Sequence, residues 1–172
     1  AWGGFIRPYV GAQEFLNSLE RWCLWLVDVP SSLLRNTNEV CDRIEAVRKF
    51  RAASNREATR TLASQPSLFG EIRQPEAPFL LLPKVSSESR RIMPIGFLPP
   101  DVVANGSALI IKNAGLLEFG VLQSTMHMAW MRATAGRMKS DYQYSAQIVY
   151  NNFPWPDIPA ALAQNKPLTP AH

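Results

Sequence analysis

The first part of the chain shows a helical period of hydrophobic residues. Between residues 38 and 53, Val40, Ile44 and Val47 recur every three or four positions, and the other positions carry most of the charged side chains. This spacing predicts an amphipathic helix that packs on one side. A shorter helix is predicted over residues 13–20.

Three further segments complete the first part of the chain. Residues 21–27 (RWCLWLV) are rich in Trp, Leu and Val, which is typical of a buried strand. Pro30 is followed by two serines, a combination that favours the start of a helix. Residues 55–70 are polar and contain Pro66 and Gly70, so they predict a surface connection with a short helix.

After Pro78 the pattern changes to short apolar runs separated by turn residues. Pro94 places one of these runs at a sheet edge or a bulge. Asn105-Gly106 separates the last two runs, and this dipeptide favours a tight hairpin turn. Strands are therefore predicted over residues 79–85, 91–98, 101–104 and 108–112.

The C-terminal part begins with residues 116–132, which are apolar on nearly all sides and predict a single buried helix that ends at Gly136. Residues 142–150 alternate well enough to predict a last strand. Five prolines after Asn151 predict an extended or irregular tail.

These elements predict a mixed α/β (α+β) fold, in which N-terminal helices are followed by a small mixed or antiparallel sheet packed around a buried helix. We divide the chain into an N-terminal helical segment (1–70), a sheet-and-helix core (71–156) and a proline-rich irregular tail (157–172). A chain of 172 residues is long enough to bury a core without disulfide or metal support.

The distribution of charge indicates where a partner binds. The chain carries a net charge of +4, and residues 84–139 alone hold seven Lys/Arg against three Asp/Glu. A polyanion is therefore expected to bind the second part of the chain. A mild basic excess is also typical of an ordinary solvated surface, and that alternative stays open.

The sequence lacks the motifs of several kinds of chemistry. It contains neither a G-x-S-x-G elbow nor a Gly-rich phosphate loop. Cys23 and Cys41 do not have the spacing of zinc ligands, and we expect reduced thiols. No apolar run approaches the length of a membrane span. We expect no catalytic, metal or cofactor site and no membrane partner, in a piece of a longer protein.

A polar segment between two predicted strands is the first candidate for binding. Residues 84–91 (KVSSESRR) combine three cations, three serines and one carboxylate. Arginine forks match phosphate oxygens or a guanine edge, and the carboxylate either accepts from a cytosine amine or holds a neighbouring arginine. A solvated hairpin loop is the alternative. The candidate DNA-binding residues here are Lys84, Ser86, Ser87, Glu88, Ser89, Arg90 and Arg91.

A second polar segment, residues 135–145 (AGRMKSDYQYS), follows the predicted buried helix. Alternation on an extended segment would place every second side chain on one face. Cation, carboxylate and amide together suit the reading of mixed base sequence, whereas phosphate binding needs only cations. The candidates here are Arg137, Lys139, Asp141 and Gln143, and Lys112 is added as a further cation of the basic region.

Long composite motifs also carry a family resemblance. They are PKVSSESRRIMPIGFL from Pro83, FGVLQSTMHMAWMR from Phe119 and GRMKSDYQYSAQIVYNNFPWP from Gly136, with RPYVGAQEF and RWCLWLVD upstream. Over most of residues 7–156 the chain resembles the target-recognition region of MmeI-like enzymes, the type IIL restriction-modification proteins. Those long chains join a nuclease, a methyltransferase and a recognition domain.

The resemblance implies a function for this chain and for its parent. The parent would transfer a methyl group from S-adenosylmethionine to the exocyclic amine of adenine, in the bacterial cytoplasm, with or without an active nuclease. This chain would bind double-stranded DNA and the methyltransferase domain of the same parent, and no cofactor of its own. Base choice in the family is thought to depend on an acidic and a cationic or polar residue two positions apart, and Asp141 and Gln143 match that pair.

One segment imitates the catalytic motif of such enzymes. Amino-directed DNA methyltransferases hold the flipped base with an Asn/Asp-Pro-Pro-aromatic tetrapeptide. Here Asn152 is followed by Phe153 in place of proline, so the motif fails. We expect Phe153 and Trp155 to anchor the chain end on the core instead.

Two other functions compete with DNA recognition. A complete small enzyme would need a nucleophile, metal or cofactor set that this sequence does not contain. A protein-interaction or structural domain would show no salt-dependent DNA affinity and no effect of changes at Arg90, Arg137 or Gln143. DNA sequence recognition for a larger adenine-specific methyltransferase is the function that the sequence favours.

Overall fold

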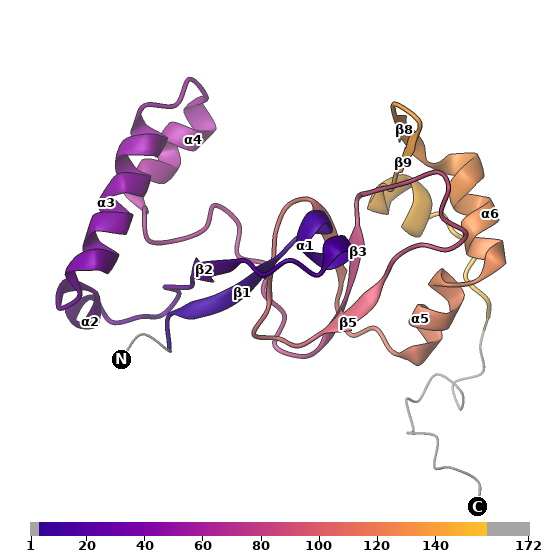
Figure 1. Ribbon diagram of the computed structural model, residues 1–172, viewed down its shortest axis with the longest axis horizontal. Coiled ribbons are helices and arrows are strands. Elements are labelled where there is room, and N and C mark those ends of the chain that lie inside the picture. Colours follow the sequence, from indigo (N-terminus) through magenta and orange to yellow (C-terminus); the bar gives the residue numbers. More distant parts are fainter. Residues whose placement is uncertain (1–3, 158–172) are drawn as a thin grey trace, which may run out of the picture. The chain divides into compact units, whose positions relative to one another are not determined.

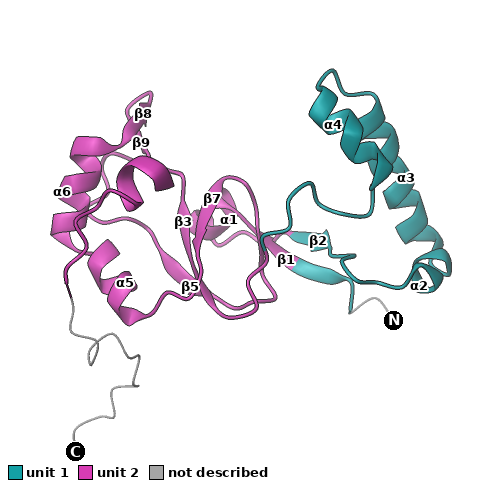
Figure 2. Ribbon diagram, turned by 180° about the vertical axis from the view of Figure 1, so that it is seen from behind, with its two compact units in different colours: residues 1–7, 22–73 teal, residues 8–21, 74–172 magenta. Residues whose placement is uncertain are grey.

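A computed structural model describes residues 4–157 of the chain (Figure 1). These residues form two compact units (Figure 2). Unit 1 comprises residues 4–7 and 22–73, and unit 2 comprises residues 8–21 and 74–157. The predicted proline-rich tail lies outside the described residues, apart from Asp157.

Unit 1 is mainly helical. Its longest element is the predicted amphipathic helix, and its predicted connection over residues 55–70 contains a short helix. The expected buried strand is short and partly exposed, because Trp22 keeps 57% of its surface in solvent. The elements of unit 1 are β2 (Trp22–Leu24), α2 (Ser31–Arg35), α3 (Asn38–Ala52), α4 (Glu57–Thr61) and the 3₁₀ turn η1 (Leu62–Ser64).

Only part of the apolar face of α3 is covered. Val40 is fully buried, whereas Val47 and Phe50 are exposed. The polar side of the unit is fixed by Arg51, whose guanidinium donates to the carbonyl oxygens of residues 62, 65 and 68 at 2.8–3.0 Å. Because these carbonyls lie in the chain that follows α4, Arg51 ties that connection to the end of α3.

Unit 2 is built around β3 (Phe79–Pro83), in which every residue is buried. A strand buried on both faces suits its unbroken apolar sequence. It lies at the centre of an antiparallel sheet between β5 (Gly96–Leu98) and β7 (Ala108–Ile111). The predicted strand over 91–98 forms only in its last three residues, after Pro94 and Ile95.

The predicted hairpin around Asn105-Gly106 is wrong. β7 pairs with β3, whereas β6 (Val103–Ala104) pairs in parallel with β1 (Ile6–Val10). Asn105 separates the two strands because its side chain accepts hydrogen bonds from both the backbone N–H and the hydroxyl of Ser107. A side-chain turn therefore replaces the tight hairpin turn.

The single helix predicted over 116–132 is instead two, α5 (Leu116–Leu122) and α6 (Thr125–Thr134). Ser124 causes the break, because its hydroxyl caps α6 by accepting from the backbone N–H of His127 at 3.1 Å. The amide of Gln123 donates to the carbonyl oxygen of Met93 at 3.0 Å and fixes the junction to the rest of the core.

The predicted last strand is also wrong beyond its first residues. β9 (Asp141–Gln143) ends early, and Ala146–Tyr150 form one turn of π-helix capped by the Ser145 hydroxyl. The turn buries Val149 against α6, and Phe153 is buried beyond it as expected. Helical spacing places these side chains on the core, which an extended strand would not do.

The main core of unit 2 lies between the central sheet, α5, α6 and the π-helical turn. Tyr142 and Tyr144 extend it toward the polar segments described below. The predicted fold class, a mixed α/β domain with N-terminal helices, is confirmed. The buried members of this core are Leu80, Leu82, Met93, Ile95, Leu122, Met128, Met131, Tyr142, Tyr144 and Val149.

Gly11 offers a test of the packing at β1. A Cβ at this buried glycine would overlap the side chain of Asn105, which is held in place by Glu14 and Ser107. Gly11→Ala is expected to lower the free energy of unfolding by about 1–2 kcal/mol, because neither partner can move freely. Urea unfolding followed by circular dichroism measures this, and a variant as stable as the wild type would contradict it.

Candidate nucleic-acid interface

A small three-stranded sheet joins the two polar segments that the sequence singled out. Its strand order is β4–β9–β8, with β4 (Val85–Ser86) from the first segment and β8 (Gly136–Met138) and β9 from the second. Figure 1 shows β8 and β9 as a hairpin. All pairings are antiparallel, and Ser86 lies opposite Tyr142, which lies opposite Arg137. Residues more than fifty positions apart in sequence therefore lie side by side.

Backbone bonds and buried tyrosines hold this sheet on the core. Lys84 lies in a bend between β3 and β4, where its N–H donates to Ser107 and its carbonyl oxygen accepts from Tyr144, at 3.0 and 2.7 Å. Tyr142 and Tyr144 are 6% and 3% exposed. The sheet therefore presents its polar edge from a rigid base.

The hairpin between β8 and β9 turns through Lys139 and Ser140. Lys139 has a φ of 57°, in the left-handed region that most side chains avoid. The turn contradicts our expectation that four alternating side chains share one face. The register places Asp141 and Gln143 on one face of the hairpin, and Arg137 on the other with Tyr142.

Arg137 is held at the centre of the joined segments. Its Nη1 donates to the carbonyl oxygen of Ser140 at 2.8 Å and lies 3.4 Å from a carboxylate oxygen of Glu88. Its guanidinium carbon lies 3.9 Å from the ring centroid of Tyr142. Every hydrogen bond that the described residues make with this side chain uses Nη1, so the edge formed by Nε and Nη2 stays available.

The loop after β4 is stabilised by its serines. The hydroxyls of Ser87 and Ser89 lie 2.9 Å apart, and the backbone N–H of Arg90 donates to the carbonyl oxygen of Ser87. Arg90 and Arg91 are exposed, and within residues 4–157 neither forms an ion pair. Two cations are thus displayed beside the anchored Arg137–Glu88 pair.

Two of the predicted binding residues lie differently from the rest. Ser86 is only 3% exposed, and its hydroxyl has no hydrogen-bond partner in the described part of the chain. Lys112 lies in the turn after β7, outside the β4–β9–β8 sheet. The residue that sequence reasoning missed is Tyr142, which supports the guanidinium of Arg137. An aromatic residue among alternating polar residues was the available signal.

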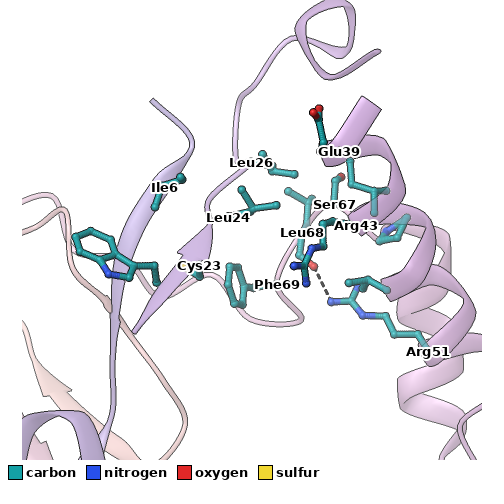
Figure 3. A pocket seen from close by; sticks show the side chains of 14 residues that line it. Ile6, Cys23, Leu24, Leu26, Glu39, Arg43, Arg51, Ser67, Leu68 and Phe69 are labelled. Atoms are coloured by element: carbon teal, nitrogen blue, oxygen red, sulfur yellow. Dashed lines mark hydrogen bonds between the residues drawn. The ribbon is translucent and has the colours of Figure 1, made fainter. Parts of the chain in front are cut away.

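A cleft of about 610 Å³ lies in unit 1 (Figure 3). Its walls are mainly apolar, with Glu39 and Arg43 among them, and Arg51 is engaged by backbone carbonyls. Burial raises the pKa of the Cys23 thiol in this cleft, with Arg7 opposing the shift, so the thiol is a poor nucleophile. The cleft brings together no set of catalytic groups.

The remaining polar groups serve the fold. The side-chain amide of Asn152 donates to the carbonyl oxygens of Gln147 and Ile148, which caps the π-helical turn. In the segment that the structure describes, no three His, Cys, Asp or Glu side chains converge as metal ligands. None of the described helices has the length and hydropathy needed to cross a bilayer.

Comparison with known proteins identifies close relatives. DNA methyltransferase A of Bacillus subtilis (strain 168) is 33% identical over 154 residues, which cover 90% of this chain and 18% of the relative. The structure of the type IIL restriction-modification enzyme MmeI in complex with DNA matches with a TM-score of 0.88 and 43% identity. That match covers 92% of this chain and 21% of the solved chain. The chain thus spans about a fifth of these relatives.

The family comparison covers all the residues that the structure describes, and so both the fold and the candidate site. The model of the MmeI target recognition domain matches residues 2–157, which include both polar segments and the whole of the β4–β9–β8 sheet. The chain therefore belongs to the MmeI target recognition domain family.

Proposed function

We propose that this domain reads the base sequence of double-stranded DNA for a larger methyltransferase. The observation that carries the proposal is the geometry of Arg137, which is fixed by three contacts that leave its Nε–Nη2 edge available. Two N–H groups on one planar edge match the O6 and N7 acceptors of guanine. A restrained side chain also loses less entropy when it binds.

Side chains on the other face of the hairpin and in the loop after β4 supply the other kinds of contact that base reading needs. Gln143 and Asp141 share a face of β9, and an amide suits adenine whereas a carboxylate suits the amine of cytosine. Arg90, Arg91 and Lys139 are exposed cations that suit phosphate oxygens. The set of contacts therefore divides into base reading and backbone positioning.

The parent activity that we propose is methyl transfer from S-adenosylmethionine to the exocyclic amine of adenine, in the bacterial cytoplasm. The methyltransferase domain would lie elsewhere in the same chain, because relatives about five times as long include a DNA methyltransferase and a restriction-modification enzyme. The domain itself has no catalytic role in this proposal. Its sequence contains neither the base-holding tetrapeptide nor a Gly-rich cofactor loop.

The competing function is a protein-interaction or structural domain. It accounts less well for an exposed group of cations beside serine, carboxylate and amide side chains, because protein interfaces favour aromatic anchors over such a mixture. The deciding experiment measures the affinity of the intact protein for duplex DNA over a series of salt concentrations. A steep, linear loss of log affinity with log salt supports DNA recognition, and affinity that is absent at low salt contradicts it.

The pair formed by Asp141 and Gln143 makes a separate prediction. Exchanging them together, Asp141→Gln with Gln143→Asp, is expected to change which base is accepted at one position of the site, because donor and acceptor groups trade places. Mapping of methylated sites by sequencing checks this. The double alanine variant serves as the control, since it should relax the preference without creating a new one. An unchanged methylation site in the exchanged variant would rule out the assignment.

A further inference from the structure

A second group of cations lies in unit 1, away from the predicted segments in sequence. Residues 43–60 contain six Lys/Arg and two Asp/Glu, an excess of four that equals the excess over residues 84–139. Counting charge over residues 1–83 conceals this group, because acidic residues elsewhere in that part offset it. Its members are Arg43, Arg48, Lys49, Arg51, Arg56 and Arg60.

Most of these cations belong to the last turns of α3, to α4 and to the short connection between them. Figure 1 shows the two helices following one another. Hydrogen bonds of the connecting turn place them there, since Arg60 donates to the carbonyl oxygen of Ser54 at 3.0 Å and the N–H of Arg56 donates to the Ser54 hydroxyl at 3.2 Å. Arg51 belongs to the fold, as shown by its three carbonyl contacts. The other cations at this end are Arg48, Lys49, Arg56 and Arg60, which we call the α3–α4 cations.

The α3–α4 cations are only partly neutralised. Glu45 pairs with Arg48 at 2.7 Å and with Lys49 at 3.8 Å, so one carboxylate serves two cations. Among the described residues, no carboxylate pairs with Arg56 or Arg60. Arg48 is held by Glu45 through both Nε and Nη2, whereas Lys49 is 78% exposed and only loosely paired.

Helix stability does not account for this arrangement. Lys49 near the end of α3 is favoured by the helix dipole, but Arg56 occupies the N-cap of α4, where the dipole disfavours a cation. Solubility does not require a cluster of one sign either. A polyanion partner explains both the unpaired charges and their concentration.

We propose that the α3–α4 cations bind the phosphate backbone of the DNA whose bases the β4–β9–β8 sheet reads. This inference rests on the proposed function and adds a second contact, made by unit 1. The four α3–α4 cations exceed the two carboxylates beside them, Glu45 and Glu57, and a net positive surface suits phosphate, which carries no sequence information. The contact therefore supplies affinity, and the discrimination between sites comes from unit 2.

The test uses the intact protein with Lys49→Gln, Arg56→Gln and Arg60→Gln combined. Affinity is measured over a salt series on a short duplex that contains the methylated site and on one in which that site is scrambled. The slope of log affinity against log salt should fall by about 2–3, and affinity near physiological salt should fall by roughly tenfold or more on both duplexes. The ratio between the two duplexes should stay unchanged.

Two controls separate a local contact from a general loss of charge. Arg21→Gln, Arg35→Gln and Arg73→Gln remove the same charge elsewhere and should change the slope much less. Lys49→Arg, Arg56→Lys and Arg60→Lys keep the charge and should restore most of the affinity. All variants should have the same melting temperature within a few degrees, measured before binding, so that unfolding is not mistaken for lost contact.

Each result has a distinct meaning. An unchanged slope in the glutamine variant overturns this inference, as does an equal loss in the control that removes charge elsewhere. Lost methyl transfer with unchanged DNA affinity also overturns it, because the surface would then serve another part of the protein. If Arg137→Ala still relaxes discrimination in any of these cases, the proposed function stands. If the intact wild-type protein binds no DNA, the proposed function itself is wrong.

Discussion

Arg137→Ala in the intact protein is expected to relax discrimination at one guanine position by about 1–3 kcal/mol, or roughly 5- to 150-fold. The variant loses the two N–H donors on the Nε–Nη2 edge, which in the wild type are available to hydrogen-bond a guanine. Binding or methylation competition among duplexes that differ at single positions measures the effect. The loss should fall on one position, since one side chain reads one base.

Three further variants test why Arg137 acts in this way. Arg137→Lys keeps the charge but cannot present a planar pair of donors, so discrimination should still fall. Glu88→Gln weakens the anchor that lies 3.4 Å from Nη1 and should reduce discrimination less than removal of the arginine. Tyr142→Phe keeps the ring under the guanidinium and serves as the control. A loss of affinity equal at every position and on scrambled DNA would instead make Arg137 a phosphate contact.

The sequence predicts the elements of this fold where one physical signal dominates. The period of α3 and the unbroken apolar run of β3 both lead to the observed elements. Prediction from the sequence is wrong where a single side chain changes the path of the backbone. Ser124 divides one apolar stretch into two helices, and Asn105 replaces a hairpin turn so that β6 and β7 pair with different strands.

The candidate site shows the same division between local and long-range information. Residue types and spacing identify both polar segments, but pairing across the β4–β9–β8 sheet depends on strands that are more than fifty residues apart. The ion pair between Arg137 and Glu88 therefore has no local signature. The alternation of side chains also predicts that residues 137–143 form one extended strand. In the structure the turn at Lys139 places Arg137 on the opposite face from Asp141 and Gln143.

His127 makes the stability of the domain depend on pH. The side chain is fully buried, its Nε2 lies 3.0 Å from the hydroxyl of Tyr144, and its Nδ1 has no partner among the described residues. The ring of Phe153 packs edge-on against it, with centroids 4.6 Å apart. Because burial penalises the charged imidazolium, the pKa of His127 is lowered from 6.5 to about 4.

A histidine whose pKa is lowered by folding binds its proton more tightly in the unfolded chain. The stabilisation is therefore complete above pH 6.5 and is lost as the pH falls from 6.5 toward 4. The pKa change corresponds to about 3 kcal/mol in total, of which about 2 kcal/mol is lost between pH 7.5 and pH 5. Urea unfolding at a series of pH values measures this loss.

His127→Gln isolates the contribution of this one group. Glutamine can still hydrogen-bond the Tyr144 hydroxyl but does not titrate, so the variant should lose about 2 kcal/mol less than the wild type between pH 7.5 and pH 5. Ser124→Ala is the matched control, because it removes the cap of α6 and should lower stability by about 1 kcal/mol equally at both pH values. Equal pH dependence in the wild type and His127→Gln would mean that the pKa of His127 is the same in the folded and the unfolded chain. The Nδ1 atom would then have a hydrogen-bond partner, and the dry packing of α6 against Tyr144 and Phe153 described above would be wrong.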